Sequence, residues 1–212
     1  MSLKKLTEAL VERLVQIGSV AETEPDWPWF TLNLTGNLFA RAHLQRMTGP
    51  KVDIVHCTVF PHTNDPSPVF GFDVVELNGQ ATAMFLDQTP TVGPEPDWPD
   101  GVTIQGHDRM LPTWATFFSK QMVSCVPTEV DMDRGVVLLG HYLDRLRPDV
   151  DGDAQAIAAA QQHYTEMQRA NPKTYRMLAS VIGPDRADEF IRTVMWPDVI
   201  TGASHGKQRT TQ

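Results

Sequence analysis

Hydrophobic and polar positions alternate in the middle of the chain over residues 52–60 and again over residues 69–75, which predicts two β-strands. The segment between them is rich in proline, asparagine, aspartate and serine, which predicts a polar turn between antiparallel strands. If the last residue of the first strand faces the first residue of the second, His56 lies opposite Asp73 on one face of the sheet. Such a pair suits proton transfer in a pocket that excludes water, and it also occurs as a hydrogen-bonded core pair.

The same patterns predict the other elements. Apolar residues at helical spacing predict an N-terminal helix that starts at Leu3 and ends near Gly18. Further strands are predicted at residues 30–34, 38–44, 81–86 and 117–126. Helices are predicted after Pro127, at residues 131–147, 153–169, 174–182 and 184–195. Strands in the middle of the chain and helices outside them predict an α/β protein, a three-layer α/β/α sandwich with a central antiparallel β-sheet.

The length of 212 residues fits a single domain over residues 1–212, with a polar tail at residues 203–212 that is expected to be flexible. The formal net charge of −8 argues against nucleic-acid binding, and no apolar run is long enough to span a bilayer. The N-terminus lacks the features of a signal peptide, and Cys57 and Cys125 fit reduced thiols. We therefore expect a cytoplasmic protein with neither nucleic acid nor membrane as a partner.

Motifs for common cofactors are missing from the sequence. It contains no glycine loop for phosphates and no dinucleotide fingerprint, and its two cysteines lack the spacing of a metal or iron–sulfur site. His62 and Asp65 follow His56 closely and raise a metal site as an alternative, but their spacing suits a turn. We expect no bound metal, and any redox chemistry would draw its electrons from a source other than a nicotinamide in a Rossmann domain.

Several short blocks stand in a fixed order along the chain. They are Asp53–Pro61, Pro68–Val75, Asp87–Pro90, Arg109–Trp114 with Phe118–Ser119, Asn171–Thr174 and Phe190–Pro197. Together they resemble the ferredoxin-dependent bilin reductases, which reduce linear tetrapyrroles such as biliverdin, over residues 38–197. Each block alone is a weak signal, whereas the ordered set is specific. The resemblance is strongest to the branch with phycocyanobilin:ferredoxin oxidoreductases, and the chain is short for that branch, as a trimmed viral member would be.

The resemblance implies an α/β/α sandwich with biliverdin IXα between the central sheet and the C-terminal helices. It implies no bound metal or flavin, because reduced ferredoxin with its 2Fe-2S cluster delivers single electrons and the substrate itself carries the radical. It also implies a monomer, located in the cytoplasm, which would be that of the bacterial host if a phage encodes the chain. Within this scheme Asp73 is expected to protonate the substrate, and His56 to share or resupply the proton.

Two positions bear on the product. Family members that make phycocyanobilin use a glutamate to reduce the exovinyl group, and an alignment with a one-residue gap places Gln45 there. An amide does not donate a proton as a carboxylic acid does, so phycoerythrobilin is the expected product, through a dihydrobiliverdin intermediate and four electrons in total. A misplaced gap would instead leave Gln45 in solvent. Asn171 stands where phycoerythrobilin synthases of the other branch have an aspartate, so the second reduction would need a different donor, such as the His56/Asp73 pair again.

The resemblance also assigns binding roles. Arg109 and Lys173 match positions that hold the bilin propionates, and Thr82 matches a small hydroxyl that touches one of them. A basic patch for an acidic ferredoxin is expected in the C-terminal helical region, from Arg169, Lys173, Arg176 and Arg192. The alternatives are phycocyanobilin as the product, a single two-electron reduction, and a bilin-binding carrier without turnover.

Overall fold

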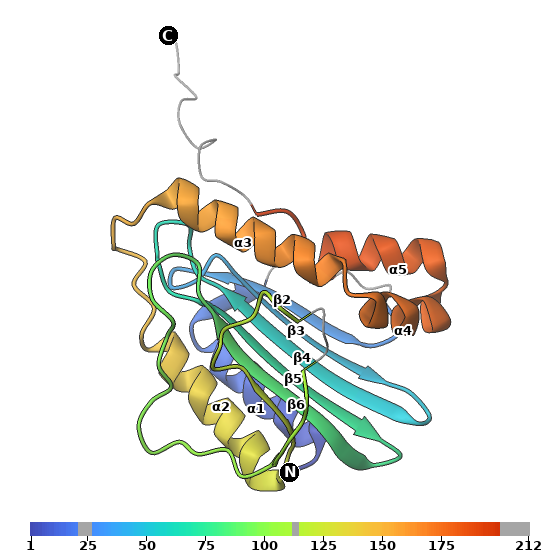
Figure 1. Cartoon of the computed structure of the whole chain (residues 1–212). Helices are drawn as coiled ribbons and strands as arrows, with labels where there is room; N and C mark the ends of the chain where they lie inside the picture. Colours follow the sequence, from blue (N-terminus) through green and yellow to red (C-terminus); the bar gives the residue numbers. More distant parts are fainter. Residues whose placement is uncertain (21–26, 112–114, 200–212) are drawn as a thin grey trace.

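One antiparallel sheet of eight strands runs through the middle of the computed structural model, which describes residues 1–20, 27–111 and 115–199. The strands are β1 (Gly18–Val20), β2 (Phe30–Gly36), β3 (Arg41–Thr48), β4 (Val52–Phe60), β5 (Val69–Leu77), β6 (Gln80–Thr89), β7 (His107–Asp108) and β8 (Val123–Val126). Their order across the sheet is β1-β2-β3-β4-β5-β6-β8-β7, so the first six strands form a meander in chain order. Figure 1 shows this meander at the centre of the molecule.

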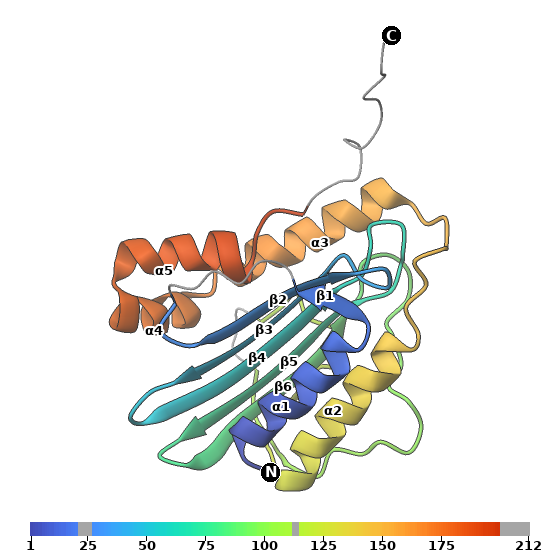
Figure 2. The ribbon, with the colours of Figure 1, turned by 180° about the vertical axis from the view of Figure 1, so that it is seen from behind.

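Helices cover both faces of the sheet. They are α1 (Leu3–Val15), α2 (Glu129–Leu143), α3 (Ala154–Arg169), α4 (Pro172–Ile182) and α5 (Pro184–Phe190), and α5 continues into a π-helix, η1 (Ile191–Met195). Helices α1 and α2 lie on one face, and α3, α4 and α5 lie on the other (Figures 1 and 2). The expected three-layer sandwich with an antiparallel sheet is confirmed. Within the described ranges, no helix combines the length and the apolar character that crossing a membrane requires.

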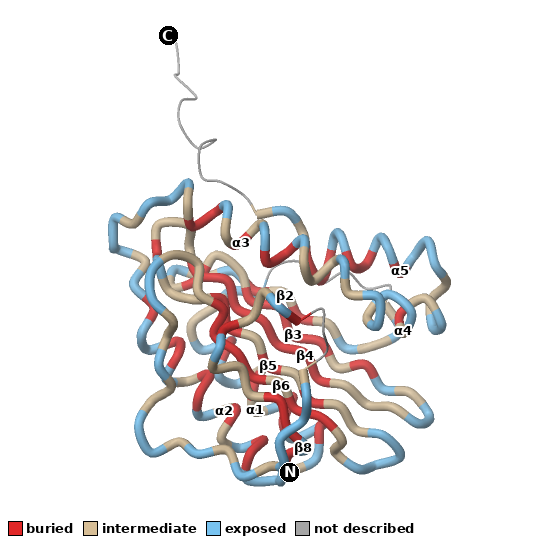
Figure 3. The backbone as a smooth tube through the Cα atoms, in the orientation of Figure 1, coloured by how far each residue is buried: buried red, intermediate tan, exposed pale blue. Residues whose placement is uncertain are grey.

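The two faces of the sheet differ because side chains alternate along each strand. The face toward α1 and α2 is apolar, with fully buried residues such as Leu44, Phe72 and Leu86 packed with Leu6 and Leu10 of α1. The opposite face also contains polar residues at buried positions, under α3, α4 and α5. Buried backbone accordingly concentrates in the central strands (Figure 3). The apolar face stabilises the fold, and the polar face is available for a site.

The hairpin of β4 and β5 has the register expected from the sequence, with His56 directly opposite Asp73. The Asn78–Gly79 turn that follows has positive φ angles of 51° and 77°, which permit the tight connection from β5 to β6. Local sequence signals also set the helix ends. Thr128 and Asp131 form a capping box at the start of α2. The other helix predictions after Pro127 agree with α3 and α4 to within a few residues.

The structure corrects several element predictions. The strand predicted at residues 38–44 is β3, which begins at Arg41 and ends at Thr48, and the helix predicted at residues 131–147 is α2, which ends at Leu143. The strand predicted at residues 117–126 is wrong for its first six positions, because Phe117 and Phe118 pack their rings against Tyr164 of α3 instead of pairing in the sheet. The helix predicted at residues 184–195 is α-helical only to Phe190 and then widens into η1. The short strands β1 and β7 were not predicted. The tail at residues 203–212 lies outside the described residues.

Gly135 and Gly140 of α2 offer a matched test of the packing between α2 and the sheet. A Cβ atom on Gly135 would lie 2.2 Å from Cζ of Phe72, whereas the nearest atom to one on Gly140 is Cζ of Arg13 at 4.0 Å. Gly135→Ala should therefore lower the free energy of unfolding by about 1–3 kcal/mol through overpacking. Gly140→Ala should raise it by about 0.5–1 kcal/mol through helix propensity. Urea unfolding measures both, and equal effects would contradict the tight α2–sheet contact.

Candidate active site

A cavity of about 480 Å³ lies between the polar face of the sheet and the C-terminal helices, within the usual range for a small-molecule site. The structure brings all seven site residues predicted from the sequence to this cavity: Gln45, His56, Asp73, Thr82, Arg109, Asn171 and Lys173. The rest of its lining is largely apolar and includes Phe85, Phe118, Met195 and Trp196. Polar groups on an apolar wall are typical of sites that bind and orient an extended, mostly apolar ligand.

Strand register explains why these residues meet. Gln45 on β3 is directly opposite His56 on β4, which is opposite Asp73 on β5, which is opposite Phe85 on β6. Directly opposed residues share one face, so these side chains form one row across four strands. Gln45 is 1% exposed and lies at the cavity, not in solvent.

A second row runs beside the first on the same face. It consists of Asn33, His43, Thr58, Gly71 and Asp87, one from each of β2 to β6. On each of these strands, the member of the second row lies two positions from the residue in line with the first row. Its side chain therefore points to the same side of the sheet. Apart from Phe85 in the first row and Gly71 in the second, the members of these two rows are hydrogen-bonding groups.

His56 and Asp73 form a hydrogen-bonded pair. Nδ1 of His56 bonds Oδ1 of Asp73, and Nε2 of His56 lies 2.9 Å from the Thr58 hydroxyl, so both ring nitrogens have partners. The His56 side chain is 8% exposed and that of Asp73 is 33% exposed. Because Asp73 is the more accessible of the two, the carboxyl is the member that can meet a ligand, with the imidazole behind it.

His43 is fully buried beside this pair. Its ring centroid lies 5.7 Å from that of His56, and its Nδ1 and Nε2 lie 2.9 Å from Asn33 Oδ1 and 3.3 Å from Gln45 Oε1. Two acceptor oxygens favour a charged ring, but burial, and after it the charges of Arg41 and His56, lower the pKa of His43 well below its ordinary value. Burial outweighs the Gln45 hydrogen bond, so His43 is a neutral group behind the cavity.

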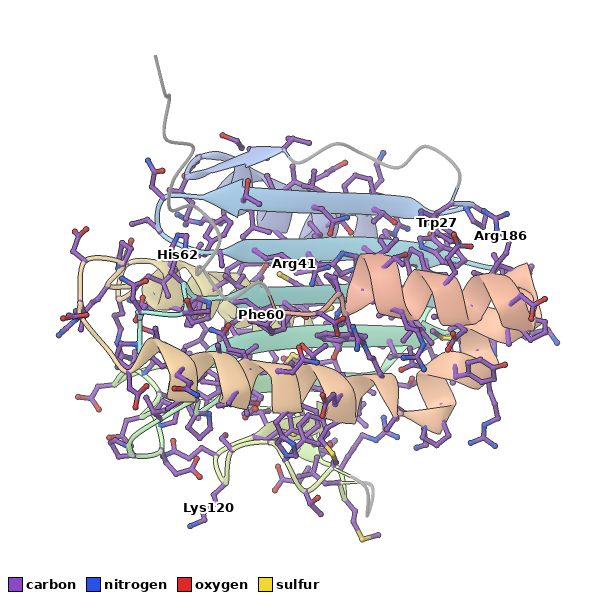
Figure 4. The ribbon with its side chains drawn as sticks, turned by 90° about the horizontal axis from the view of Figure 1, so that it is seen from above. Trp27, Arg41, Phe60, His62, Lys120 and Arg186 are labelled. Atoms are coloured by element: carbon purple, nitrogen blue, oxygen red, sulfur yellow. The ribbon has the colours of Figure 1, made fainter. Side chains whose placement is uncertain are left out.

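Arg41 connects the sheet to η1. Its guanidinium donates hydrogen bonds to the carbonyl oxygens of Val194 and Met195, the latter at 2.9 Å, and to Asn33 Oδ1 at 3.3 Å. Burial lowers the pKa of Arg41 to about 10, so the side chain stays cationic at neutral pH. Figure 4 shows Arg41 beside the end of the helical ribbon that α5 and η1 form. These bonds hold the end of η1, and with it Trp196, whose ring centroid is 5.2 Å from that of His56.

Asp87 is a second carboxyl on this face, 3% exposed and part of the cavity lining. Its oxygens accept hydrogen bonds from the Ser119 hydroxyl at 2.5 Å, the Ser119 backbone N–H at 3.3 Å and the Thr89 hydroxyl. Burial raises the pKa of Asp87, and these hydrogen bonds only partly oppose the rise. A carboxyl with a raised pKa keeps its proton to higher pH than an exposed aspartate.

Positive groups stand at the mouth of the cavity. Arg109 and Lys173 are exposed, and Arg109 Nη1 donates to the Thr82 carbonyl oxygen at 2.6 Å. The Thr82 hydroxyl donates to the Val75 carbonyl oxygen at 3.3 Å. Asn171 caps α4, because its Oδ1 accepts a hydrogen bond from the Lys173 backbone N–H at 3.0 Å. These contacts fix the backbone around two exposed cations, an arrangement suited to carboxylate groups of a ligand.

The other candidates considered from the sequence lie elsewhere or are already paired. His62 Nε2 donates to the Gly36 carbonyl oxygen, and Asp65 accepts bonds from backbone N–H groups of Ser67 and Arg147, so both stabilise a turn. In the described part of the chain, no three His, Cys, Asp or Glu side chains are grouped to hold a metal ion. In the basic patch, Arg169 and Arg192 pair with Asp198 and Asp188 at 2.8 and 2.9 Å.

Sequence reasoning gave no role to Arg41, His43, Asp87, Tyr164 or Trp196. A signal for His43 and Asp87 was present, because an alternation of polar residues continues past the ends of the strands predicted at residues 38–44 and 81–86. His43 stands two positions from Gln45, and Asp87 two positions from Thr89. Asp87 and Trp196 also lie in the blocks that carried the resemblance. Tyr164 had no such signal, since it comes from a helix that meets the sheet only in three dimensions.

Comparison with known proteins assigns the class. The family model of ferredoxin-dependent bilin reductases matches residues 29–197. The chain therefore belongs to the ferredoxin-dependent bilin reductases, oxidoreductases supplied with electrons by ferredoxin, as expected from the sequence.

Individual relatives agree. Phycocyanobilin:ferredoxin oxidoreductase from Trichodesmium erythraeum is 31% identical over 176 residues, which cover 74% of this chain and 71% of the relative. The enzyme of the same name from Gloeobacter violaceus is 34% identical over 176 residues, which cover 75% of this chain and 70% of the relative.

Solved structures share the fold. The structure of PcyX matches with a TM-score of 0.69 at 19% identity and covers 93% of this chain and 99% of that chain. Tomato phytochromobilin synthase, solved in complex with biliverdin, matches with a TM-score of 0.69 at 16% identity and covers 93% of this chain and 84% of that chain. At these identities the likeness shows the α/β/α architecture.

His43 makes the stability of the protein depend on pH. The folded protein binds the His43 proton more weakly than the unfolded chain, in which a histidine has a pKa of about 6.5. Above that pH, His43 does not lower the free energy of unfolding. As the pH falls below it, the free energy of unfolding decreases by up to about 1.4 kcal/mol per pH unit. Urea unfolding between pH 7 and pH 5 should show a shallower pH slope for His43→Gln than for the parent.

The matched control is His141→Gln, because His141 is an exposed residue of α2. This variant should retain the pH slope of the parent protein. A slope that is the same in the parent and in His43→Gln would show that His43 is not the group responsible.

Proposed function

We propose that this protein reduces biliverdin IXα with electrons from reduced ferredoxin, four electrons in total, through a dihydrobiliverdin intermediate to phycoerythrobilin. The observation that carries the proposal is the His56–Asp73 pair on the wall of a cavity of about 480 Å³ in a member of this family. The structure of tomato phytochromobilin synthase with biliverdin, which has the same fold, supports a linear tetrapyrrole as the ligand.

Proton supply is the work of the His56–Asp73 pair. Each two-electron reduction of a bilin consumes two electrons and two protons, and ferredoxin brings the electrons singly, so the substrate carries an unpaired electron between deliveries. Asp73, the more exposed member, protonates the bilin. His56 then passes its proton to Asp73, while Thr58 keeps the ring in place through its second nitrogen. No chemistry at a bound metal or flavin is part of this scheme.

Binding uses the apolar wall and the charged mouth. Phe85 and Trp196 provide flat surface for the pyrrole rings, and Arg109 and Lys173 pair with the two propionates. The carbonyl oxygen of Thr82 accepts a hydrogen bond from the Arg109 side chain and helps to hold it in place. Asn171 positions the backbone of Lys173. An acidic ferredoxin would dock beside the mouth as a partner of the monomer, on the basic patch of the C-terminal helices to which the exposed Arg176 belongs.

The choice of product rests on Gln45. Its carboxamide is buried in the row of His56 and Asp73 and is held by His43. Because an amide is not a proton-donating acid, this position does not supply a proton to a vinyl group, and a product that keeps the vinyl group follows. Phycocyanobilin remains the alternative product, favoured by the names of the relatives. A carrier without turnover is less consistent with a hydrogen-bonded acid on the cavity wall.

An anaerobic assay with biliverdin, ferredoxin and a ferredoxin-reducing system tests the function. The parent protein should convert biliverdin to phycoerythrobilin, followed by absorbance and identified by chromatography. Asp73→Asn should still bind biliverdin but reduce it at least about 100-fold more slowly, because it removes the acid and keeps the shape.

Asp133→Asn is the matched control, since Asp133 is an exposed residue of α2 on the opposite side of the sheet, and it should react like the parent. Bound but unchanged biliverdin with the parent protein would favour the carrier. Parent-like turnover by Asp73→Asn would refute the proton-donor role.

Gln45→Glu tests the product assignment. A carboxylic acid at this position restores a proton donor beside His43 and His56, so we expect phycocyanobilin to appear among the products. Chromatography of the products after complete reaction is the measurement. An unchanged product ratio, with a carboxyl shown to be present by mass spectrometry, would show that residue 45 does not decide which double bond is reduced.

A further inference from the structure

The proposed function leaves one requirement open, which is the acid for the second reduction. Two successive reductions at different places on one tetrapyrrole need protons at different places in the cavity. Gln45 is not an acid, and Asn171 is an amide that caps α4. Among the described residues that line the cavity, the carboxyl groups are those of Asp73 and Asp87.

We infer that Asp87 is a catalytic residue of the second two-electron reduction, where it delivers a proton to the bilin after the His56–Asp73 pair has served the first. This inference rests on the proposed function and goes beyond it by assigning the second acid. In the step, the O–H bond of the Asp87 carboxyl breaks and a bond from that hydrogen to the bilin forms. Two reduced ferredoxins supply one electron each, and the His56–Asp73 pair, which has taken up a proton from solvent after the first reduction, supplies the second proton. Dihydrobiliverdin thus gains two electrons and two protons.

The placement of Asp87 fits this role. Asp73 on β5 faces Phe85 on β6, and Asp87 lies two residues further along β6, on the same face. Diagonal neighbours of this kind have Cα atoms about 7–8 Å apart. Two acids at that spacing can address different rings of a ligand that spans the cavity, whereas a single acid cannot reach both without movement of the ligand.

A hydrogen-bond donor lies beside the two carboxyls. Gly71 occupies the position opposite Asp87, and a Cβ atom there would lie 3.4 Å from the hydroxyl oxygen of Tyr164. The Tyr164 hydroxyl accepts a hydrogen bond from Gln168 Nε2 at 2.9 Å, which leaves its own proton to donate. The negative charges of Asp87 and Asp73 both act on Tyr164 and add to the burial that raises its pKa. The phenol thus stands between the two acids as a positioning residue for the ligand.

The partners of Asp87 permit both protonation states. The hydroxyls of Ser119 and Thr89 donate to the carboxylate when it is charged, and a hydroxyl can rotate to accept when the carboxyl carries a proton. Burial favours the protonated form, in line with the raised pKa. A group that gives up a proton and regains it needs an environment that tolerates both forms, and this cluster provides one.

A purely structural role for Asp87 is the competing explanation. The backbone N–H and the hydroxyl of Ser119 both donate to Asp87, which ties the loop before β8 to β6. If this tie were the only role, its weakening would disturb both reductions alike. If Asp87 is the acid for the second reduction, its loss should slow the second reduction much more than the first. A structural anchor alone does not lead to this difference.

The experiment compares Asp87→Asn with Ser119→Ala under the anaerobic assay, supplied first with biliverdin and then with purified dihydrobiliverdin. Asp87→Asn should slow the reduction of biliverdin far less than the reduction of dihydrobiliverdin, and it should therefore accumulate dihydrobiliverdin. Its rate with dihydrobiliverdin should fall at least about 100-fold, as for loss of a general acid. Ser119→Ala removes a hydrogen bond of the anchor but keeps the carboxyl, so it should still form the final product. Asp87→Glu, which restores an acid, should recover part of the second reduction.

The first reduction in each variant also reports whether the variant is folded. Equal loss of both reductions in Asp87→Asn, or a parent-like ratio of final product to dihydrobiliverdin, would overturn the assignment of Asp87. A parent protein that binds biliverdin without reducing it would overturn the proposed function itself, and Asp87 with it. A parent protein that stops at dihydrobiliverdin would overturn the role of Asp87 while leaving bilin reduction intact.

Discussion

The pairing register of strands β3 to β6 is the constraint on which the rest of the structure depends. Because side chains alternate with a period of two, a slip of one residue in any of these pairs would turn its polar residues toward α1 and α2. The register is specified from the other side of the sheet, where a largely apolar face is buried against two helices. The hydrophobic effect on one face therefore aligns the hydrogen-bonding groups on the other.

Polar groups on a buried sheet face are costly unless they find partners, and those around the cavity do so in three small clusters. The hydroxyls of Thr31 and Ser124, which continue the first row at its two ends, have no hydrogen-bond partner among the described residues. Asn33, His43 and Gln45 form one cluster, Thr58, His56 and Asp73 a second, and Thr89, Asp87 and Ser119 a third. The first two clusters each join the two rows of the sheet, and the third joins a loop to the sheet. The cavity lies between this face and the C-terminal helices, and its polar groups are oriented before a ligand arrives. Such preorganisation is the usual basis of electrostatic catalysis.

The sequence allowed the hairpin of β4 and β5 to be predicted with its register, because alternation and turn residues act locally. The helices after Pro127 were predicted for the same reason. Residues 117–122 were misjudged because Phe117 and Phe118 pack against a helix that a local pattern does not reveal. The site residues other than His56 and Asp73 came from the resemblance to a family. Tyr164 and Asp87 become neighbours of Asp73 only through the register and the helix above it, which short-range patterns do not encode.

The π-helical turn η1 has a consequence for how this family member can change over generations. Its backbone bonds from Trp196 N to Ile191 O enclose one residue more than an α-helix would. Each helical residue turns the chain by about 100°, so the loss of one codon within this turn would rotate the segment that follows. Trp196 would leave its place beside His56, and the carbonyl groups held by Arg41 would shift with it. The cavity wall and this extra residue are therefore inherited together, and lineages with this pocket should tolerate substitutions in η1 far better than deletions.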